Sequence, residues 1–336
     1  MNRAPVLVTG ANGYIGSFVT KLLLEKGFKV RGSVYSLARK SDYQFLYDLF
    51  PQSKSNLELV EADLTSKDAW PSVTKGVDSI FHVASPTPGS APPEDEYFTK
   101  PAVAGVLNVL EAALKNDVRK VVVTSSVAAV AFRPKDKVCT EEDWEAEEGL
   151  VPYPKSKVRA EKAAWEFYEK NKGKMELAVV NPSFVFGPVL TSKGNTSSFV
   201  GTVMSGVLPG VFDSMMPIVD VRDVAEVHYR AMFNEKANGK RYLCVAESVP
   251  LGDVAHWLNK EFGKKGIKVP EGKVSLEEAK RHWNPEVKVF VETFGKRLVY
   301  DNQRSVKDLG MEYIPVEKTI IETGNSLLEH GMVKIE

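Results

Sequence analysis

The sequence has very little cysteine and no excess of charge of either sign. Cys139 and Cys244 are the two cysteines among 336 residues, too few for a disulfide framework, and no pattern beside them indicates a metal or redox pair. The chain carries 44 basic and 44 acidic residues, which argues against nucleic acid or an anionic membrane as the main partner. The five histidines are scattered without the spacing of a metal site.

Long apolar runs are missing as well. No stretch approaches the roughly 18 apolar residues that a transmembrane helix needs. A strand-like segment begins already at Val6, so the N-terminus shows no signal-peptide pattern. These absences predict a cytoplasmic protein without a membrane or nucleic-acid partner, and they are compatible with either a monomer or a homodimer.

The segment from Val6 to Ser17 is the most informative in the chain. Apolar residues predicted to form a buried strand lead into Gly10, Gly13 and Gly16, and a helical pattern follows. Strand, glycine turn and helix in this order are typical of a dinucleotide-binding site. Gly10 permits a tight turn, Gly13 lets the backbone approach a pyrophosphate, and Gly16 lets the helix pack against the strand. The helix N-terminus attracts phosphate.

Short apolar strands alternate with helical segments through the first half of the chain. We expect strands at 5–9, 28–34, 57–61, 78–83, 118–125 and 175–181, and helices at 14–26, 39–50, 66–75, 94–115 and from Tyr153 to Glu169. This alternation predicts an α/β protein with a Rossmann doubly wound parallel sheet.

The regularity weakens after residue 181. Residues 217–235 return to a strand and a helix, and further helices are expected at 251–263, 275–282 and 315–330. We therefore predict two domains. Residues 1–181 and 217–235 form an NADP-binding Rossmann domain, and residues 182–216 and 236–336 form a smaller, discontinuous substrate-binding lobe.

Two further patterns indicate where chemistry occurs. Tyr153 and Lys157 are four residues apart at the head of a helix, which places both side chains on one face. Upstream, a buried strand ends in Thr124, Ser125 and Ser126. Ligands of parallel sheets bind beyond the carboxyl ends of the strands, so these hydroxyls are expected near the reactive end of a cofactor.

In their order, these features resemble the extended short-chain dehydrogenase/reductase superfamily. The T-G-x-x-G-x-x-G motif from Thr9, the Thr-Ser-Ser strand end and Y-x-x-x-K at Tyr153 follow one another as in that superfamily. V-R-G-S from Val30, H-V-A-S-P from His82 and N-P-S-F-V-F-G-P from Asn181 are most similar to dihydroflavonol reductases, cinnamoyl-CoA reductases and fungal methylglyoxal/carbonyl reductases.

The resemblance implies reduction of a carbonyl by Ser126, Tyr153 and Lys157. Tyr153 would give a proton to the substrate oxygen and Ser126 would hold that oxygen. Lys157 would lower the pKa of the phenol from its usual value of about 10 and bind the nicotinamide ribose. Ser125 is the alternative to Ser126, because one sequence does not determine the strand register.

The cofactor is expected to be NADPH/NADP⁺. An acidic residue after the second strand favours NAD, whereas a basic residue accommodates the 2′-phosphate. Here Tyr35 is followed by Arg39 and Lys40 without an acidic residue before Asp42. We predict Arg39 as the phosphate ligand and Lys40 as the second; the alternative is that both are solvated charges. The resemblance extends the cofactor site to Gly10, Asn12, Gly13, Tyr14, Ile15, Gly16, Asp63, Leu64, Val83, Ala84, Ser85, Thr124, Ser125, Pro182, Ser183 and Val185.

The expected substrate site is apolar. Besides Ser126 it comprises Val127, Phe132, Phe184, Phe199, Met204 and Met215, with Phe186, Val203, Phe212 and Met216 in the same segments. Such a lining predicts an aldehyde or ketone with an apolar or aromatic remainder; alternatively, these residues only pack the lobes together. Cinnamoyl-CoA is not expected as substrate, because Gly-Leu-Val-Pro precedes Tyr153 where those reductases carry Asn-Trp-Tyr-Cys-Tyr around the catalytic tyrosine.

Two other functions share these motifs. An NAD-dependent nucleotide-sugar epimerase or dehydratase would prefer an acidic residue after the second strand and a basic pocket, and the sequence shows neither. A non-catalytic dinucleotide-binding sensor would not need an intact set of Ser126, Tyr153 and Lys157.

Overall fold

The computed structural model describes residues 4–85, 95–133, 137–192, 198–206, 208, 210–267, 269–281 and 294–333. Its larger part is a seven-stranded parallel sheet in the order β3-β2-β1-β4-β5-β6-β9. The strands are β1 (Val6–Thr9), β2 (Val30–Val34), β3 (Leu57–Glu61), β4 (Ser79–His82), β5 (Lys120–Thr124), β6 (Glu176–Pro182) and β9 (Lys240–Cys244). The order reverses between β1 and β4, where open sheets of this kind bind ligands. The expected Rossmann fold is confirmed.

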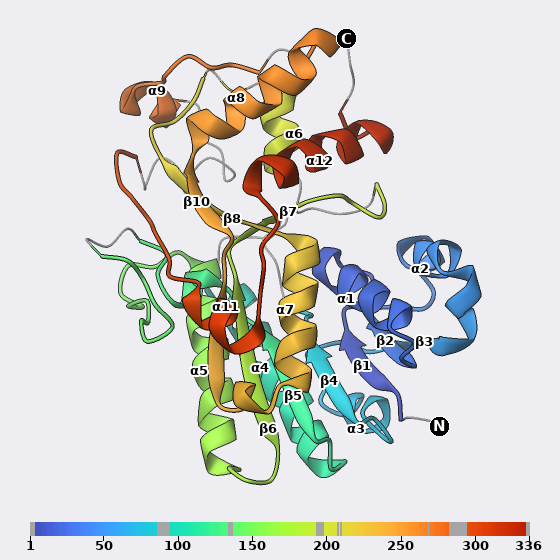
Figure 1. Ribbon diagram of the computed structural model, residues 1–336. Helices are drawn as coiled ribbons and strands as arrows, with labels where there is room; N and C mark the ends of the chain where they lie inside the picture. Colours follow the sequence, from blue (N-terminus) through green and yellow to red (C-terminus); the bar gives the residue numbers. More distant parts are fainter. Residues whose placement is uncertain are drawn as a thin grey trace.

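Helices cover both faces of this sheet (Figure 1). One face carries α1 (Tyr14–Glu25) and α7 (Val221–Phe233), and the other carries α4 (Asp95–Lys115) and α5 (Pro152–Lys170). Alternate strand residues point to opposite faces: Val8 and Phe81 belong to the buried core beneath α1 and α7, and Leu7 and Ile80 belong to the core beneath α4 and α5.

A smaller lobe lies above the carboxyl ends of the strands in Figure 1. It is built on the three-stranded sheet β10-β8-β7 and has its own apolar core, which includes Val200, Leu258, Phe262 and Ile320. Its elements are β7 (Phe184–Phe186), α6 (Ser198–Met204), β8 (Met215–Asp220), β10 (Glu247–Pro250), α8 (Leu251–Phe262), α9 (Leu276–Arg281) and α12 (Val316–Glu329).

Two expected helices are shorter in the structure. The segment 39–50 forms the 3₁₀ turn η1 (Lys40–Asp42) and then α2 (Gln44–Leu49), because Tyr43 between them has φ −134° and ψ −8°. The segment 66–75 contributes only α3 (Trp70–Val73), with Pro71 in its first turn, a position that suits the start of a helix. The remaining short elements are η2 (Pro51–Asn56), η3 (Val127–Ala129), η4 (Glu235–Ala237), η5 (Gly263–Lys265) and α11 (Gln303–Leu309).

Two strands pair differently from the expected division of the chain. β8, which we expected in the Rossmann domain, pairs with β7 and β10 in the smaller sheet. β9, which we expected in the smaller lobe, pairs in parallel with β6 and completes the main sheet. Tyr242 and Cys244 of β9 are fully buried in the core beneath α1 and α7, and this burial explains the pairing. Among the described residues, no helix is both long and apolar enough to span a bilayer.

Candidate active site

The glycine turn between β1 and α1 is as tight as its sequence predicts. Gly10 has φ +63°, and its carbonyl accepts a hydrogen bond from the Gly13 amide at 2.9 Å. A Cβ on Gly16 would lie 2.1 Å from that same carbonyl oxygen, so a side chain there would force α1 away from β1. The turn therefore brings the N-terminus of α1, with its unpaired N–H groups, to the carboxyl edge of the sheet.

The segment after β4 is hydrogen-bonded to the end of β1, directly before this turn. The Thr9 hydroxyl accepts from the Ala84 amide at 2.9 Å and lies 3.0 Å from His82 Nδ1. Burial, assisted by the nearby Lys157 ammonium, lowers the pKa of His82 to about 3. The imidazole is therefore neutral at physiological pH, and the Thr9 hydroxyl that it contacts holds Ala84 beside the glycine turn.

Tyr153, Lys157 and Ser126 converge at the same edge. Ser126 hydrogen-bonds the phenol of Tyr153. The Lys157 ammonium lies 5.5 Å from the centre of the Tyr153 ring and donates a 2.9 Å hydrogen bond to Ser85 Oγ. The side chains of α5 thus meet residues that follow β4 and β5, as expected for neighbouring parallel strands.

The pKa values of the two α5 side chains move in opposite directions. Burial lowers the pKa of Lys157 to about 8, and Glu161 opposes this shift. Burial raises the pKa of Tyr153, and its hydrogen bond with Ser126 offsets only part of the rise. The expected lowering of the Tyr153 pKa by Lys157 is therefore absent here, because desolvation of the phenol dominates and the ammonium is bonded to Ser85.

The three hydroxyls after β5 have different partners. Only Ser126 reaches Tyr153. The buried Ser125 donates to Glu161 Oε2 at 2.6 Å, and Thr124 Oγ1 lies 2.6 Å from His228 Nε2 on α7. The geometry therefore favours Ser126 over Ser125 as the hydroxyl that meets a substrate.

The residues after β2, predicted to meet the adenosine end of a dinucleotide, form an exposed loop. The Arg39 guanidinium lies 5.6 Å from the centre of the Tyr35 ring, whose side chain is 63% exposed. Sequence reasoning missed Glu61, which comes from β3. Its Oε2 accepts from the Leu37 amide at 2.8 Å and from Ser36 Oγ at 3.2 Å, and it thereby shapes the loop between Tyr35 and Arg39. Lys40 is exposed at the start of η1.

Several other predicted cofactor residues have their side chains bonded within the protein. Asp63 Oδ1 accepts from the amide and the hydroxyl of Thr65, both at 2.8 Å. Asn12 Nδ2 donates to the Asp42 carbonyl at 3.3 Å. The Tyr14 hydroxyl donates to the carbonyl of Gly187 at 3.0 Å. Val83 packs with Ile15 against the core beneath α1, and Leu64 packs with the core beneath α4.

The segment 182–185 leaves one polar atom without a partner. The Ser183 amide donates to the Cys244 carbonyl at 3.1 Å, and Pro182 and Val185 on either side are buried. The Ser183 hydroxyl is buried and has no hydrogen-bond partner among the described residues. A buried orphan hydroxyl at this edge indicates a place where a polar ligand group fits.

The residues predicted to line the substrate site separate into two groups. Met204 and Val203, with Phe186, Phe212 and Met216, are buried in the core of the smaller lobe. Val127, the first residue of η3, is buried in a separate apolar cluster. Phe132, Phe184, Phe199 and Met215 are only half-buried.

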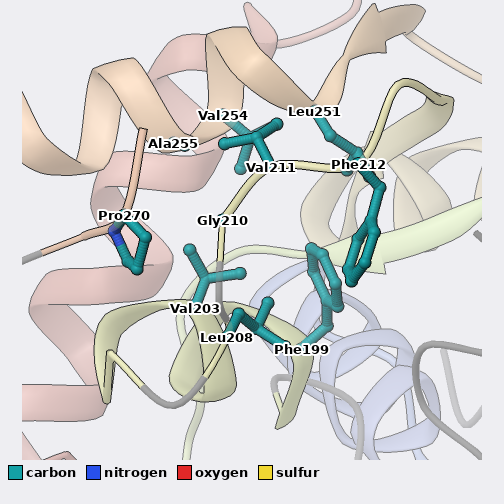
Figure 2. A pocket seen from close by; sticks show the side chains of 10 residues that line it. All are labelled: Phe199, Val203, Leu208, Gly210, Val211, Phe212, Leu251, Val254, Ala255 and Pro270. Atoms are coloured by element: carbon teal, nitrogen blue, oxygen red, sulfur yellow. The ribbon is translucent and has the colours of Figure 1, made fainter. Parts of the chain in front are cut away.

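Phe199 belongs to an apolar pocket in the smaller lobe (Figure 2). The pocket has a volume of about 320 Å³ including its open mouth. Its lining comes from α6, the segment before β8, α8 and the segment after η5, and consists of Phe199, Val203, Leu208, Gly210, Val211, Phe212, Leu251, Val254, Ala255 and Pro270. No charged side chain is among these residues.

Comparison with known proteins agrees with this geometry. Residues 6–244 match the model of the NAD-dependent epimerase/dehydratase family. The chain is 35% identical to cinnamoyl-CoA reductase 1 of Petunia hybrida, over 98% of this chain and 94% of that protein. It superposes on the yeast methylglyoxal/isovaleraldehyde reductase Gre2, solved with NADPH, with a TM-score of 0.81 at 30% identity, covering 98% and 100% of the two chains. Vestitone reductase from alfalfa gives a TM-score of 0.78 at 26% identity, covering 98% and 100%.

These relatives are oxidoreductases, and they cover nearly the whole chain rather than its nucleotide-binding half alone. The resemblance inferred from the glycine turn, the Thr-Ser-Ser strand end and the Tyr153–Lys157 pair is thereby confirmed. The chain belongs to the NAD-dependent epimerase/dehydratase family, within the extended short-chain dehydrogenases/reductases.

Proposed function

We propose that the protein is an NADPH-dependent carbonyl reductase that acts on aldehydes or ketones with an apolar or aromatic remainder. One observation carries this proposal. The Tyr153 phenol is hydrogen-bonded to Ser126 and lies beside the buried Lys157 ammonium, at the edge of the sheet where the glycine turn is built for a dinucleotide.

The residues present fit such a cofactor. The glycine turn offers a backbone cradle in which a Gly16 Cβ would collide with Gly10, and the N-terminus of α1 suits the pyrophosphate. The unpartnered Ser183 hydroxyl is available for the nicotinamide half, and Lys157 with Ser85 for its ribose. At the other end, Arg39 beside Tyr35 would take the 2′-phosphate. When bound, NADPH supplies the hydride.

The protein's own residues supply the proton. The Ser126 hydroxyl would hold the carbonyl oxygen against Tyr153, whose raised pKa keeps the phenol protonated and ready to donate. As the carbonyl carbon gains the hydride, its oxygen takes the phenol proton and becomes the alcohol. In the structure the Lys157 ammonium is bonded to Ser85; once the phenol has lost its proton, we expect the ammonium to turn toward the phenolate, because an ammonium favours a nearby anion. Positioned acids of this kind typically contribute about 10²–10⁴ in rate.

The comparisons support the reductase over the alternatives. The cinnamoyl-CoA reductase and Gre2 are named as reductases, and Gre2 was solved with NADPH. The smaller lobe and its neighbourhood offer apolar surface rather than the charges that a sugar nucleotide would need. This surface comes from the half-buried Phe132, Phe184 and Met215 and from the apolar pocket of Figure 2.

The experiment is a screen of the purified protein with NADPH against aldehydes and ketones. We expect oxidation of NADPH in step with formation of the matching alcohol, and much slower turnover with NADH. Absence of turnover with every carbonyl, or conversion of a nucleotide sugar without net consumption of NADPH, would contradict the proposal.

A further inference from the structure

Glu161 is a fully buried acid one helical turn beyond Lys157 on α5. Its side chain is 0% exposed. Tyr153, Lys157, Glu161 and Trp165 follow one another at intervals of four, so they form one stripe along the helix. A buried carboxyl with no role in proton donation requires an explanation, because burying a charge is costly unless it is paired and hydrogen-bonded.

Three hydrogen-bond donors and one cation surround this carboxyl group. Oε2 accepts from Ser125 Oγ at 2.6 Å and from Asn181 Nδ2 at 2.7 Å. Oε1 accepts from Trp165 Nε1 at 3.2 Å and lies 2.5 Å from Arg241 Nε. An ionised carboxylate offers about four acceptor sites and no donor. The surroundings are therefore matched to a carboxylate anion, and an amide would place N–H groups against N–H and O–H donors.

Arg241 on β9 is the counter-charge, and it is itself held in place. Its side chain is 7% exposed. Nη1 donates to the carbonyls of Glu141 and Asp143 at 3.1 and 2.9 Å, and the guanidinium lies 3.8 Å from the centre of the Trp144 ring. The pair thus ties α5 to the outermost strand of the sheet and to the segment 141–144.

The carboxylate also reaches the reacting groups from two sides. Asn181 Nδ2, which bonds Glu161, also donates to the backbone carbonyl of Ser126 at 3.1 Å, and Ser125 precedes Ser126 directly. From the other side, Glu161 acts on the Lys157 ammonium through its charge.

We propose that the buried Glu161–Arg241 pair is a positioning pair of the active site, which holds Ser126 through Ser125 and Asn181 and places an anion one helical turn from Lys157. The proposal concerns residues outside the Ser126, Tyr153 and Lys157 set. It rests on the proposed reductase function for its kinetic test, and a second measurement below does not depend on that function.

The kinetic test compares Glu161→Gln with Glu166→Gln, an exposed glutamate on the same helix. Misplacement of a catalytic group typically costs about 100-fold in rate. We expect Glu161→Gln to lower kcat by about that factor and to change the Kd for NADPH much less, because the pair does not contact the glycine turn and reaches the cofactor only through Lys157. Glu166→Gln should match the unmodified protein in both. An unchanged kcat in folded Glu161→Gln would overturn the proposal.

A second variant, Asn181→Ala, tests the proposal even if Glu161→Gln fails to fold. Asn181→Ala leaves the ion pair intact and removes the link to the Ser126 carbonyl. We expect kcat to fall about tenfold or more in folded protein, with the Kd for NADPH unchanged. If Asn181→Ala keeps full kcat, Ser126 is not held through Glu161 and the proposal fails.

The measurement that is independent of turnover is an NMR titration of the Lys157 ammonium in protein with isotopically labelled lysine. The charged or titratable groups recorded beside it are Tyr153 and Glu161 on α5 and His82 on β4. Removing the one anion should lower the pKa of Lys157 by about one unit, and an unchanged pKa would show that Glu161 does not act on Lys157. If the unmodified protein reduces no carbonyl, the reductase proposal fails. The titration then decides by itself whether Glu161 acts on Lys157.

Discussion

At the scale of single residues, two side chains one helical turn apart have separate roles in the proposed mechanism. In that mechanism Tyr153 carries the transferable proton, and its raised pKa keeps it protonated. Lys157 carries the charge, although burial lowers its pKa to about 8. The ammonium is bound to Ser85 rather than to the phenol, so Lys157 is connected to the segment that lines the cofactor site and Tyr153 is connected to Ser126.

This division predicts different effects for the two substitutions. Tyr153→Phe should lower kcat by about 10²–10⁴ and leave the Kd for NADPH nearly unchanged, because the phenol donates the proton without holding the cofactor. Lys157→Ala should lower kcat and weaken NADPH binding together. Steady-state kinetics and a fluorescence titration with NADPH separate the two parameters. Activity of the Phe variant close to that of the unmodified protein would rule out Tyr153 as the acid.

The second residue-scale prediction concerns the choice of cofactor. Arg39→Ala should raise the KM for NADPH by about 10- to 150-fold, since a hydrogen bond to a charged group contributes about 1.5–3 kcal/mol. The KM for NADH should barely change, because NADH has no 2′-phosphate for Arg39 to contact. Equal affinity of the unmodified protein for both cofactors would show that Arg39 and Lys40 are ordinary solvated charges.

The sequence could predict residues whose neighbours are close along the chain, and it missed those that meet through the sheet. Tyr153 and Lys157 are one helical turn apart, so their shared face follows from spacing alone. Glu61 reaches the loop after β2 only because β3 pairs with β2. Glu161 is separated from Arg241 by 80 positions (241 − 161), and no local pattern joins a glutamate on a helix to an arginine on an unpredicted strand.

At the scale of elements, α7 is attached to the chain segment that leads into α12. Asp223, in the first turn of α7, accepts a 2.8 Å hydrogen bond from the Ile314 amide. Its side chain is buried, and this burial, together with the charge of Asp220, raises its pKa to about 6 although the Ile314 bond opposes the rise. The carboxyl group therefore fits its surroundings best when it is neutral.

We predict that Asp223→Asn stabilises the protein at neutral pH. A raised folded-state pKa contributes stability that is present below the unfolded value near 4 and is lost as pH rises through about 6. Asparagine keeps an oxygen for the Ile314 amide and never ionises. The variant should match the original in thermal unfolding at pH 4 and exceed it above pH 7, by at most about 3 kcal/mol. A difference that does not change with pH would contradict the assignment.

The elements that could be predicted are those with a long, regular pattern. The glycine turn, α1 and the buried strands β1 to β6 follow from apolar runs that alternate with helical segments. β7, β10, α6 and α11 span only three to seven residues, too few for a period to be read. The sequence of β9 shows no clearer alternation of apolar and polar residues than these short elements. Only its pairing with β6 shows that it belongs to the main sheet.

At the scale of the whole molecule, the chain crosses between the lobes several times. It leaves β6 for β7, returns from β8 into α7, and leaves β9 for β10 (Figure 1). Asp220, at the junction of β8 and α7, is fully buried and accepts from Arg222 Nε at 2.8 Å and from Thr319 Oγ1 of α12 at 2.9 Å. These bonds tie α7 to β8 and α12 of the smaller lobe, so we expect a substrate that reaches Ser126 and Tyr153 to extend along the smaller lobe.

The smaller lobe can offer apolar surface to such a substrate. Phe184 and Met215 are half-buried in adjacent strands, and methionine adapts to varied shapes. A homologous series of aldehydes or α-ketoesters should therefore gain about 0.8 kcal/mol in kcat/KM for each methylene that becomes buried, until the site is full. Hydroxylated or charged analogues of equal size should gain nothing, because an unpaired polar group loses its water without replacement. Measured kcat/KM values across both series test this, and a preference for the charged members would point instead to a nucleotide-sugar substrate.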